Sequence, residues 1–358
     1  MRFAALAGLM ALVVSPVSAD KFDDEIEKLL KDAKAAGCAI AVSEKGRTTF
    51  AKGYGFANLE HRVKMRPDHV HELASVSKQF TAVSILQLVD AGKLKLDDSL
   101  DRFFDGAPES WKKVQISHLL NHTSGLPDYL SALGNPGLDV NDNRLVSLIS
   151  DKPLVFEPGS KWEYSNSGYM MLGLIVAKVS GLSFGDYMQK HLFDPAGMKT
   201  AAWNDTRLLL PNRADGYSLR SGVIVREPFT SSSLSKTGDG QVMASALDLL
   251  AWAKALDEGR LLKPATAARM NEICEPSKQS VEGETRGYGF GVMLRRRGEL
   301  LVQQHGGGWM GTRTHLIRYI KESKTLVILG NSDSAPIDKI LALCEDRFLG
   351  KRVLAPKG

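Results

Sequence analysis

The sequence predicts an α+β protein in which both ends of the chain build one lobe and the middle builds another. Strand-like runs occur near the N-terminus (residues 38–43 and 48–54) and again in the last third (288–329). The stretch between them consists mostly of helical segments and loops. A chain of 358 residues is long enough for two domains, or for one large domain of two lobes. We predict a single domain over residues 20–358, with an α/β lobe from about 20–80 and 240–350 and a helical lobe from about 81–239.

The N-terminal elements follow from apolar periodicity. Phe22, Ile26 and Leu30 recur at helical spacing, which predicts an amphipathic helix over about residues 21–36 that Gly37 ends. Two strands at 38–43 and 48–54 then form a hairpin around a short turn. The run from 79 to 91 is apolar nearly all round, which is typical of a buried helix.

The remaining elements are predicted in the same way. Helices are expected at 116–121, 142–150, 167–180 and 184–191, and Ser245 with Asp248 gives the next helix a capping-box start. Strands are expected at 288–294, 300–304, 312–319 and 325–329. The final helix carries an apolar face made of Ile337, Ile340, Leu341, Cys344 and Phe348. This order of elements is what predicts antiparallel strands from both chain ends with helices between them.

Composition and charge exclude several classes of protein. With 43% hydrophobic and 24% charged residues, the chain has ordinary globular composition and is not disordered. A net charge of +5 without long basic runs indicates neither a nucleic acid nor an anionic membrane surface as partner.

The cysteines and histidines do not indicate a metal site. Cys38, Cys274 and Cys344 are an odd number without C-x-x-C spacing, and the eight histidines show no H-E-x-x-H pattern. We predict no metal, and Cys38 and Cys344 as small buried apolar residues. At most one disulfide can form, and the sequence leaves open whether any pair does.

The first 19 residues have the pattern of a secretory signal peptide. Arg2 precedes an apolar run over residues 3–14, and Val17-Ser18-Ala19 resembles a signal-peptidase site. The run is too short to span a bilayer as a helix. We expect export to the periplasm or outside the cell, a mature chain beginning at Asp20 and no stable membrane span after cleavage. The alternative is an uncleaved N-terminal anchor.

The strongest chemical motif is the S-x-x-K sequence Ser75-Val76-Ser77-Lys78, where a strand-like stretch gives way to the buried helix. The positive end of a helix favours negative charge developing on the Ser75 oxygen. Lys78 lies one helical turn further on the same face, within reach of that oxygen. The simpler interpretation is a capping serine and a solvated lysine. However, a lysine that enters an apolar helix is costly, which favours a chemical role for the pair.

A second motif is Tyr164-Ser165-Asn166, in a short loop before the helix predicted at 167–180. A phenol beside a lysine ammonium loses its proton more readily and can act as a general base. Taken alone, the motif is better interpreted as a core tyrosine followed by a capping asparagine.

A third motif, His305-Gly306-Gly307-Gly308, follows the strand predicted at 300–304. Glycines beside a strand edge allow a substrate to approach the backbone and leave an N–H free to stabilise an oxyanion. Taken alone, the motif is a bulge or a turn.

Together and in this order, the three motifs resemble those of the penicillin-recognising serine hydrolases. This family includes class C β-lactamases, D-alanyl-D-alanine carboxypeptidases, D-aminopeptidases and related esterases, and its pattern is S-x-x-K, Y-x-N, then K-T-G or H-x-G. The resemblance extends over about residues 20–345, including 119–129 and 305–311. It implies the β-lactamase/transpeptidase-like fold, with an antiparallel sheet flanked by the terminal helices, a second all-helical lobe, and the site between the lobes.

The resemblance also implies roles for individual residues. Ser75 would be the nucleophile, and Lys78 and Tyr164 would share its proton. Asn166, His305 and Gly307 would contact the substrate, with His305 in place of the usual lysine. The backbone N–H groups of Ser75 and Gly308 would form the oxyanion hole. No cofactor is implied.

Three other pattern matches do not fit their context. Residues 236–238 spell K-T-G, but they precede the helix at Ser245 and follow no strand, so we expect a loop before a surface helix. Residues 181–185 match the nucleophile elbow G-x-S-x-G, but a helix precedes them, and Ser183 is better interpreted as an N-cap. Residues 306–311 match G-x-G-x-x-G, but no helix follows.

The implied function is that of a secreted serine hydrolase that forms an acyl-enzyme and cleaves an amide or ester in a small-molecule or peptide substrate. D-amino-acid peptides and carboxylesters are favoured, because the family's β-lactamases usually carry lysine where this chain has His305. Histidine would hold a substrate carboxylate more weakly. The alternatives are a true class C-type β-lactamase and, from another class, a non-hydrolysing receptor for β-lactams or peptides. The physiological substrate and the oligomeric state stay open.

Overall fold

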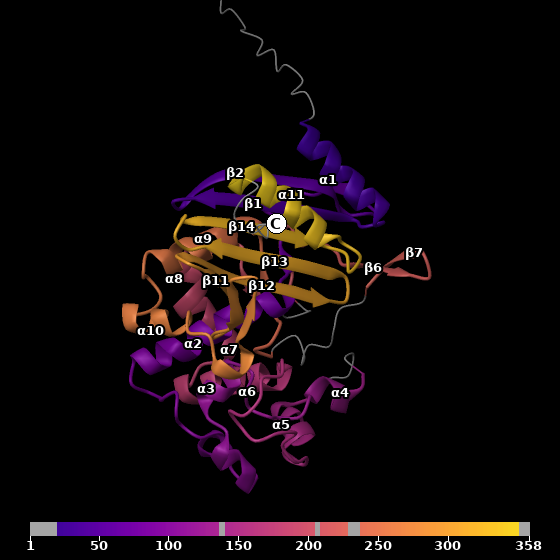
Figure 1. Ribbon diagram of the computed structural model, residues 1–358. Helices are drawn as coiled ribbons and strands as arrows, with labels where there is room; N and C mark the ends of the chain where they lie inside the picture. The colour runs from indigo at the N-terminus through magenta and orange to yellow at the C-terminus, as the bar shows by residue number, and fades with distance from the viewer. Residues whose placement is uncertain (1–19, 136–139, 205–207, 228–236, 351–358) are drawn as a thin grey trace, which may run out of the picture.

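A computed structural model describes residues 20–135, 140–204, 208–227 and 237–350 (Figure 1). Its centre is a nine-stranded sheet in which every pair of neighbouring strands is antiparallel. In spatial order the strands are β3 (Val63–Lys64), β2 (Arg47–Asn58), β1 (Gly37–Glu44), β14 (Lys324–Gly330), β13 (Thr312–Tyr319), β12 (Leu300–Trp309), β11 (Met293–Arg297), β10 (Glu284–Tyr288) and β9 (Gln279–Val281). Since β1 pairs with β14, the two ends of the chain meet in the middle of the sheet.

The terminal helices α1 (Lys21–Asp32) and α11 (Ile337–Leu349) lie together on one face of the sheet (Figure 1). Alternation along β1 sets the two faces: Ile40 packs in the cluster with these helices, whereas Ala39 and Ala41 belong to the main core on the other face. The predicted α+β fold with terminal helices on an antiparallel sheet is therefore confirmed.

The other helices lie on the main-core side of the sheet or below it (Figure 1). They are α2 (Lys78–Asp90), α3 (Ile116–Leu120), α4 (Tyr129–Leu133), α5 (Asp142–Ser150), α6 (Asn166–Ser180), α7 (Phe184–Met188), α8 (Asp194–Ala196), α9 (Ala246–Asp257) and α10 (Pro264–Arg269). Two small sheets complete the fold, one of β4 (His71–Glu72), β8 (Val242–Ala244) and β5 (Ala202–Trp203), the other of β6 (Tyr217–Arg220) and β7 (Val223–Arg226).

Several predicted boundaries were wrong for local reasons. The strand predicted at 288–294 is the end of β10, a turn and the start of β11, because the chain turns at Gly291, whose φ is +74°. The helix predicted to residue 36 ends at Asp32, before Lys34 adopts a left-handed φ of +51°. The strand predicted at 300–304 continues to Trp309, so the glycine motif lies within β12. The helix predicted at 184–191 ends at Met188, where the chain continues in a wider helical turn.

Cys38 and Cys344 are fully buried in the cluster formed by α1, α11 and the sheet, as predicted. Both are free thiols, as is Cys274. Burial raises the pKa of Cys344 to about 12, which keeps this thiol protonated.

The predicted signal peptide, residues 1–19, lies outside the described residues. Within them, no single helix has the length and apolar character needed to cross a bilayer; only α6 taken with the segment Phe184–Ala196, bent from it by 79°, meets those criteria.

Candidate active site

Ser75 lies in a tight 3₁₀ turn, η1 (Ala74–Ser77), that joins β4 to the start of α2. The turn begins with an unfavourable conformation, because Ala74 has a left-handed φ of +47°. Two contacts hold it in place: the Thr314 hydroxyl donates to the Leu73 carbonyl (2.7 Å), and the Val242 N–H donates to the Ser77 hydroxyl (2.9 Å). Packing from β13 and β8 thus fixes the Ser75 backbone at the head of a buried helix.

Lys78 is fully buried, and its ammonium group is completely hydrogen-bonded. Its Nζ donates to Ser75 Oγ at 3.2 Å, to Asn166 Oδ1 at 2.8 Å and to the Asp239 carbonyl at 2.6 Å. Three acceptors use all three N–H bonds, which offsets the cost of burying the group. The predicted reach of Lys78 to the Ser75 oxygen is therefore found, and Asn166 is bound to the same ammonium group.

Aromatic rings surround the lysine. Lys78 Nζ lies 4.9 Å from the centre of the Tyr164 ring and 5.6 Å from that of Tyr169, close enough for cation–π attraction. The His122 ring lies 4.4 Å from the Tyr164 ring. Burial, together with the charge of Lys78, lowers the pKa of His122, so this imidazole is neutral. Tyr164 thus lies between a buried lysine and an uncharged histidine.

His305 is buried behind the site and hydrogen-bonded through both ring nitrogens. Its side chain is 1% exposed, and its Nε2 accepts a hydrogen bond from the Tyr288 hydroxyl (2.9 Å) while Nδ1 donates to the Gly306 carbonyl (2.6 Å). Burial, and then the charge of Lys78, lower the pKa of His305 to about 3. A neutral, buried imidazole cannot hold a substrate carboxylate as an ion pair. The substrate contact of His305 stays a prediction, and the buried, neutral ring does not offer it a charged partner.

Gly307 also serves the site through its backbone. A Cβ atom at this position would lie 2.2 Å from the Leu73 carbonyl oxygen and 2.4 Å from Thr314 Oγ1. Strand β12 can therefore lie directly against the residues before η1 only because position 307 is glycine. This packing contact brings Gly308 to the pocket that contains Ser75. The substrate contact of Gly307 stays a prediction.

Ser75 lies on the wall of a pocket of about 190 Å³. Its described lining consists of Ala74, Ser75, Tyr129, Leu130, Tyr164, Asn166, Asp239, Gly240, Gln241, Gly308 and Trp309. Of the predicted site residues, Ser75, Tyr164, Asn166 and Gly308 meet here, with Lys78 beneath them. The roles of Ser75 and Gly308 in an oxyanion hole stay predictions.

Three further lining residues, Tyr129, Asp239 and Trp309, were not predicted from the sequence. Tyr129 and Trp309 lie inside the two stretches, 119–129 and 305–311, that carried the family resemblance, so a weak signal existed for both. Asp239 follows the K-T-G sequence directly, and Lys236 of that sequence lies outside the described residues. The Gly238 carbonyl accepts from the Thr81 hydroxyl of α2, and α9 is largely buried. The expected loop is present over the described residues 237–240 and packs on α2, whereas the expectation that the helix after it lies on the surface was wrong.

The other serine that matched a nucleophile pattern has a capping role, as predicted. Ser183 Oγ accepts a hydrogen bond from the Asp186 N–H (3.1 Å) at the start of α7, and Gly181 ends α6 with a φ of +74°.

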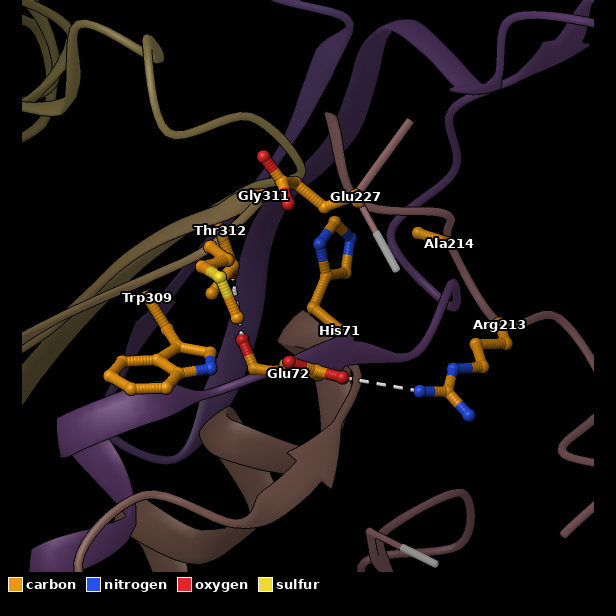
Figure 2. A pocket seen from close by; sticks show the side chains of 10 residues that line it. His71, Glu72, Arg213, Ala214, Glu227, Trp309, Gly311 and Thr312 are labelled. Atoms are coloured by element: carbon orange, nitrogen blue, oxygen red, sulfur yellow. Dashed lines mark hydrogen bonds and ion pairs between the residues drawn. The ribbon is translucent and has the colours of Figure 1, made fainter. Parts of the chain in front are cut away.

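A second, smaller pocket shares Trp309 with the first in its lining, and Figure 2 shows this second pocket. Its volume of about 30 Å³ offers room for water rather than for a substrate. Figure 2 shows His71 in this lining beside the ion pair of Glu72 and Arg213, whose nearest atoms are 3.1 Å apart. His71 is 2% exposed, neither ring nitrogen has a hydrogen-bond partner among the described residues, and burial lowers its pKa to about 3.

We expect His71 to make the protein less stable in mild acid. Between pH 6.5 and about 3 the unfolded chain binds a proton at this residue that the folded chain does not. Its contribution to the free energy of unfolding is therefore complete above pH 6.5 and decreases by about 1 kcal/mol per pH unit as the pH falls. Urea denaturation at several pH values should show a shallower pH dependence for His71→Gln than for the wild type. Equal slopes would contradict the assignment.

Comparison with known proteins places the chain among β-lactamase-related proteins. Residues 22–342 match the family model described as Beta-lactamase. Penicillin-binding protein 4* of Bacillus subtilis (strain 168) is 34% identical over 82% of this chain and 68% of its own length. The D-aminopeptidase of Gluconobacter oxydans (strain 621H) is 29% identical over 84% of this chain and 56% of its own length. The chain therefore spans between about half and two thirds of these relatives.

Solved structures show the same fold. The octameric penicillin-binding protein homologue from Pyrococcus abyssi has a TM-score of 0.82 at 27% identity, covering 92% of this chain and 77% of that one. The D-amino acid amidase from Ochrobactrum anthropi SV3 has a TM-score of 0.75 at 23% identity, covering 89% and 96%, which shows likeness of fold alone.

Proposed function

Because the chain belongs to the Beta-lactamase family of serine hydrolases, we propose that it forms an acyl-enzyme on Ser75 and hydrolyses an amide or ester bond. The observation that carries the proposal is the 3.2 Å contact between Ser75 Oγ and the buried Lys78 Nζ, beside Tyr164 and at the bottom of a pocket. A purely structural role for Lys78 would not explain why its ammonium group contacts a serine hydroxyl at the start of a helix beside a pocket.

The chemistry follows from this arrangement. Ser75 Oγ attacks the substrate carbonyl carbon and gives its proton to the pair formed by Lys78 and Tyr164, in which the deprotonated Tyr164 oxygen is the acceptor because the Lys78 ammonium already carries three N–H bonds. The N–H groups of Ser75 and Gly308 stabilise the oxyanion. The pair then passes the proton to the leaving amine or alcohol as the C–N or C–O bond breaks. Water attacks the remaining ester in the same way, which releases a carboxylic acid and restores Ser75.

Electrostatics favour a peptidase or esterase over a β-lactamase. The described pocket lining contains no lysine or arginine, and Lys78 already uses its three N–H bonds. A substrate carboxylate, such as those of β-lactams and of peptides with a free C-terminus, would find no free cation among these described lining residues. The name of the D-aminopeptidase relative supports an amide substrate. Export, which rests on residues 1–19, is part of the proposal.

The test compares the wild type with Ser75→Ala on p-nitrophenyl butyrate, D-alanyl-p-nitroanilide and nitrocefin. We expect turnover of the ester or the anilide by the wild type, background rates for Ser75→Ala, and fluorophosphonate labelling that peptide mapping places on Ser75. Faster turnover of nitrocefin than of either other substrate would show that the protein is a β-lactamase instead. Labelling of Ser75 by a fluorescent penicillin without turnover of any substrate would indicate the receptor instead.

A further inference from the structure

Asp239 is a buried carboxylate on the wall of the catalytic pocket, and the acylation chemistry does not use it. The residue is 6% exposed and lines the pocket with Ser75 and Asn166. Its carbonyl oxygen accepts from Lys78 Nζ at 2.6 Å, and Lys78 Nζ is 3.2 Å from Ser75 Oγ. A single atom, Lys78 Nζ, thus connects the backbone carbonyl of Asp239 with the nucleophile Ser75.

Only one of the two carboxylate oxygens is hydrogen-bonded within the described residues. Oδ2 accepts from the Tyr129 hydroxyl at 3.0 Å, and Oδ1 is buried with no partner among them. Burial, and then the charge of Asp239, raise the pKa of Tyr129, so its hydroxyl stays protonated and donates. A buried carboxylate with an unpaired oxygen is costly unless something binds to it.

Asp239 is also the one carboxylate in the described lining, which contains no lysine or arginine. The neighbouring cation, Lys78, donates its three N–H bonds to Ser75 Oγ, Asn166 Oδ1 and the backbone carbonyl of Asp239. None of them goes to the Asp239 carboxylate. The free position at the carboxylate therefore suits a hydrogen-bond donor that carries positive charge and arrives with the substrate.

We infer that Asp239 binds a protonated amino group of the substrate, so that the preferred substrates are amides or esters of amino acids with a free amine. This inference rests on the proposed function and narrows it. An ammonium group would fill the unpaired oxygen and orient the neighbouring carbonyl toward Ser75. Acylation of that amine removes both the charge and two of its N–H bonds, so N-blocked substrates should bind poorly.

The experiment compares D-alanyl-p-nitroanilide with N-acetyl-D-alanyl-p-nitroanilide in the wild type, Asp239→Asn and Asp239→Glu. The readout is the ratio of kcat/KM for the free amine to that for the acetylated amine. We expect a ratio of at least about 10 in the wild type, since charge-assisted hydrogen bonds are the strong ones. The ratio should fall to about 1 in Asp239→Asn, mainly through KM, and should be largely kept in Asp239→Glu, which retains the charge.

If Asp239→Asn fails to fold, the pH dependence of KM in the wild type still tests the inference. An α-amine loses its proton near pH 8, so KM for the free-amine substrate should rise above that pH and KM for the acetylated one should not. A wild-type ratio near or below 1, with Ser75 labelled and both substrates turned over, would overturn the inference and leave the proposed function standing. Loss of Ser75 labelling and of all turnover in the wild type would overturn the proposed function itself.

Discussion

Replacing Lys78 by alanine, or Tyr164 by phenylalanine, should each slow acylation of Ser75 by about 10²–10⁴-fold, the usual worth of general acid–base help. The two changes act differently on the structure. Tyr164→Phe keeps the ring that lies 4.9 Å from Lys78 Nζ and removes only the hydroxyl. Lys78→Ala removes the ammonium group that donates to Ser75 Oγ, and Asn166 Oδ1 also loses its hydrogen bond from that group.

The double variant should be scarcely slower than either single one, because residues that act as a unit have strongly non-additive effects. Burst-phase measurement of the acyl-enzyme with a p-nitrophenyl ester gives the acylation rate directly. Urea denaturation of each variant separates this effect from unfolding, since loss of a buried hydrogen-bonded group costs about 1–3 kcal/mol. If Tyr164→Phe acylates at the wild-type rate, Lys78 acts without the phenol and the shared proton path is wrong.

Periodicity predicted the elements whose apolar pattern is unambiguous. The helix at 142–150 and the strand at 312–319 have the predicted bounds, as α5 and β13 show. The turn between β10 and β11 was missed because residues 288–294 alternate like one continuous strand, although Gly291 adopts a positive φ within them. A pattern of apolar residues does not report the backbone conformation of a glycine.

The site was predictable where chemistry and sequence spacing coincide, as for Ser75 and Lys78 on one helical turn. The burial and neutral state of His305 could not be predicted because its surroundings come from elsewhere in the chain: Tyr288 lies two strands away in the sheet, and the charge of Lys78 comes from α2. Asp239 was missed for the same reason. Its position depends on how the segment after residue 236 packs against α2, which local sequence does not show.

Gly307→Ala should reduce kcat by at least about 10²-fold, the typical cost of losing one oxyanion-hole donor. The added Cβ would lie 2.2 Å from the Leu73 carbonyl and 2.4 Å from Thr314 Oγ1, and these two atoms are held together by a 2.7 Å hydrogen bond. Neither can move freely, so β12 must shift away from η1. Because Gly308 follows directly, its N–H would move relative to Ser75, and the hole that the mechanism requires would no longer be formed.

Gly306→Ala is the matched control for this prediction. It adds the same methyl group to the same strand, but its nearest neighbours, at 3.7–3.9 Å, include His315 Nδ1 and the Thr314 carbonyl, which is ordinary contact. It should therefore keep acylation within a few-fold of the wild type. Overpacking at Gly307 should also lower the free energy of unfolding by about 1–3 kcal/mol, which urea denaturation can measure. Equal acylation rates in the two variants would show that the contact between β12 and η1 does not position the oxyanion hole.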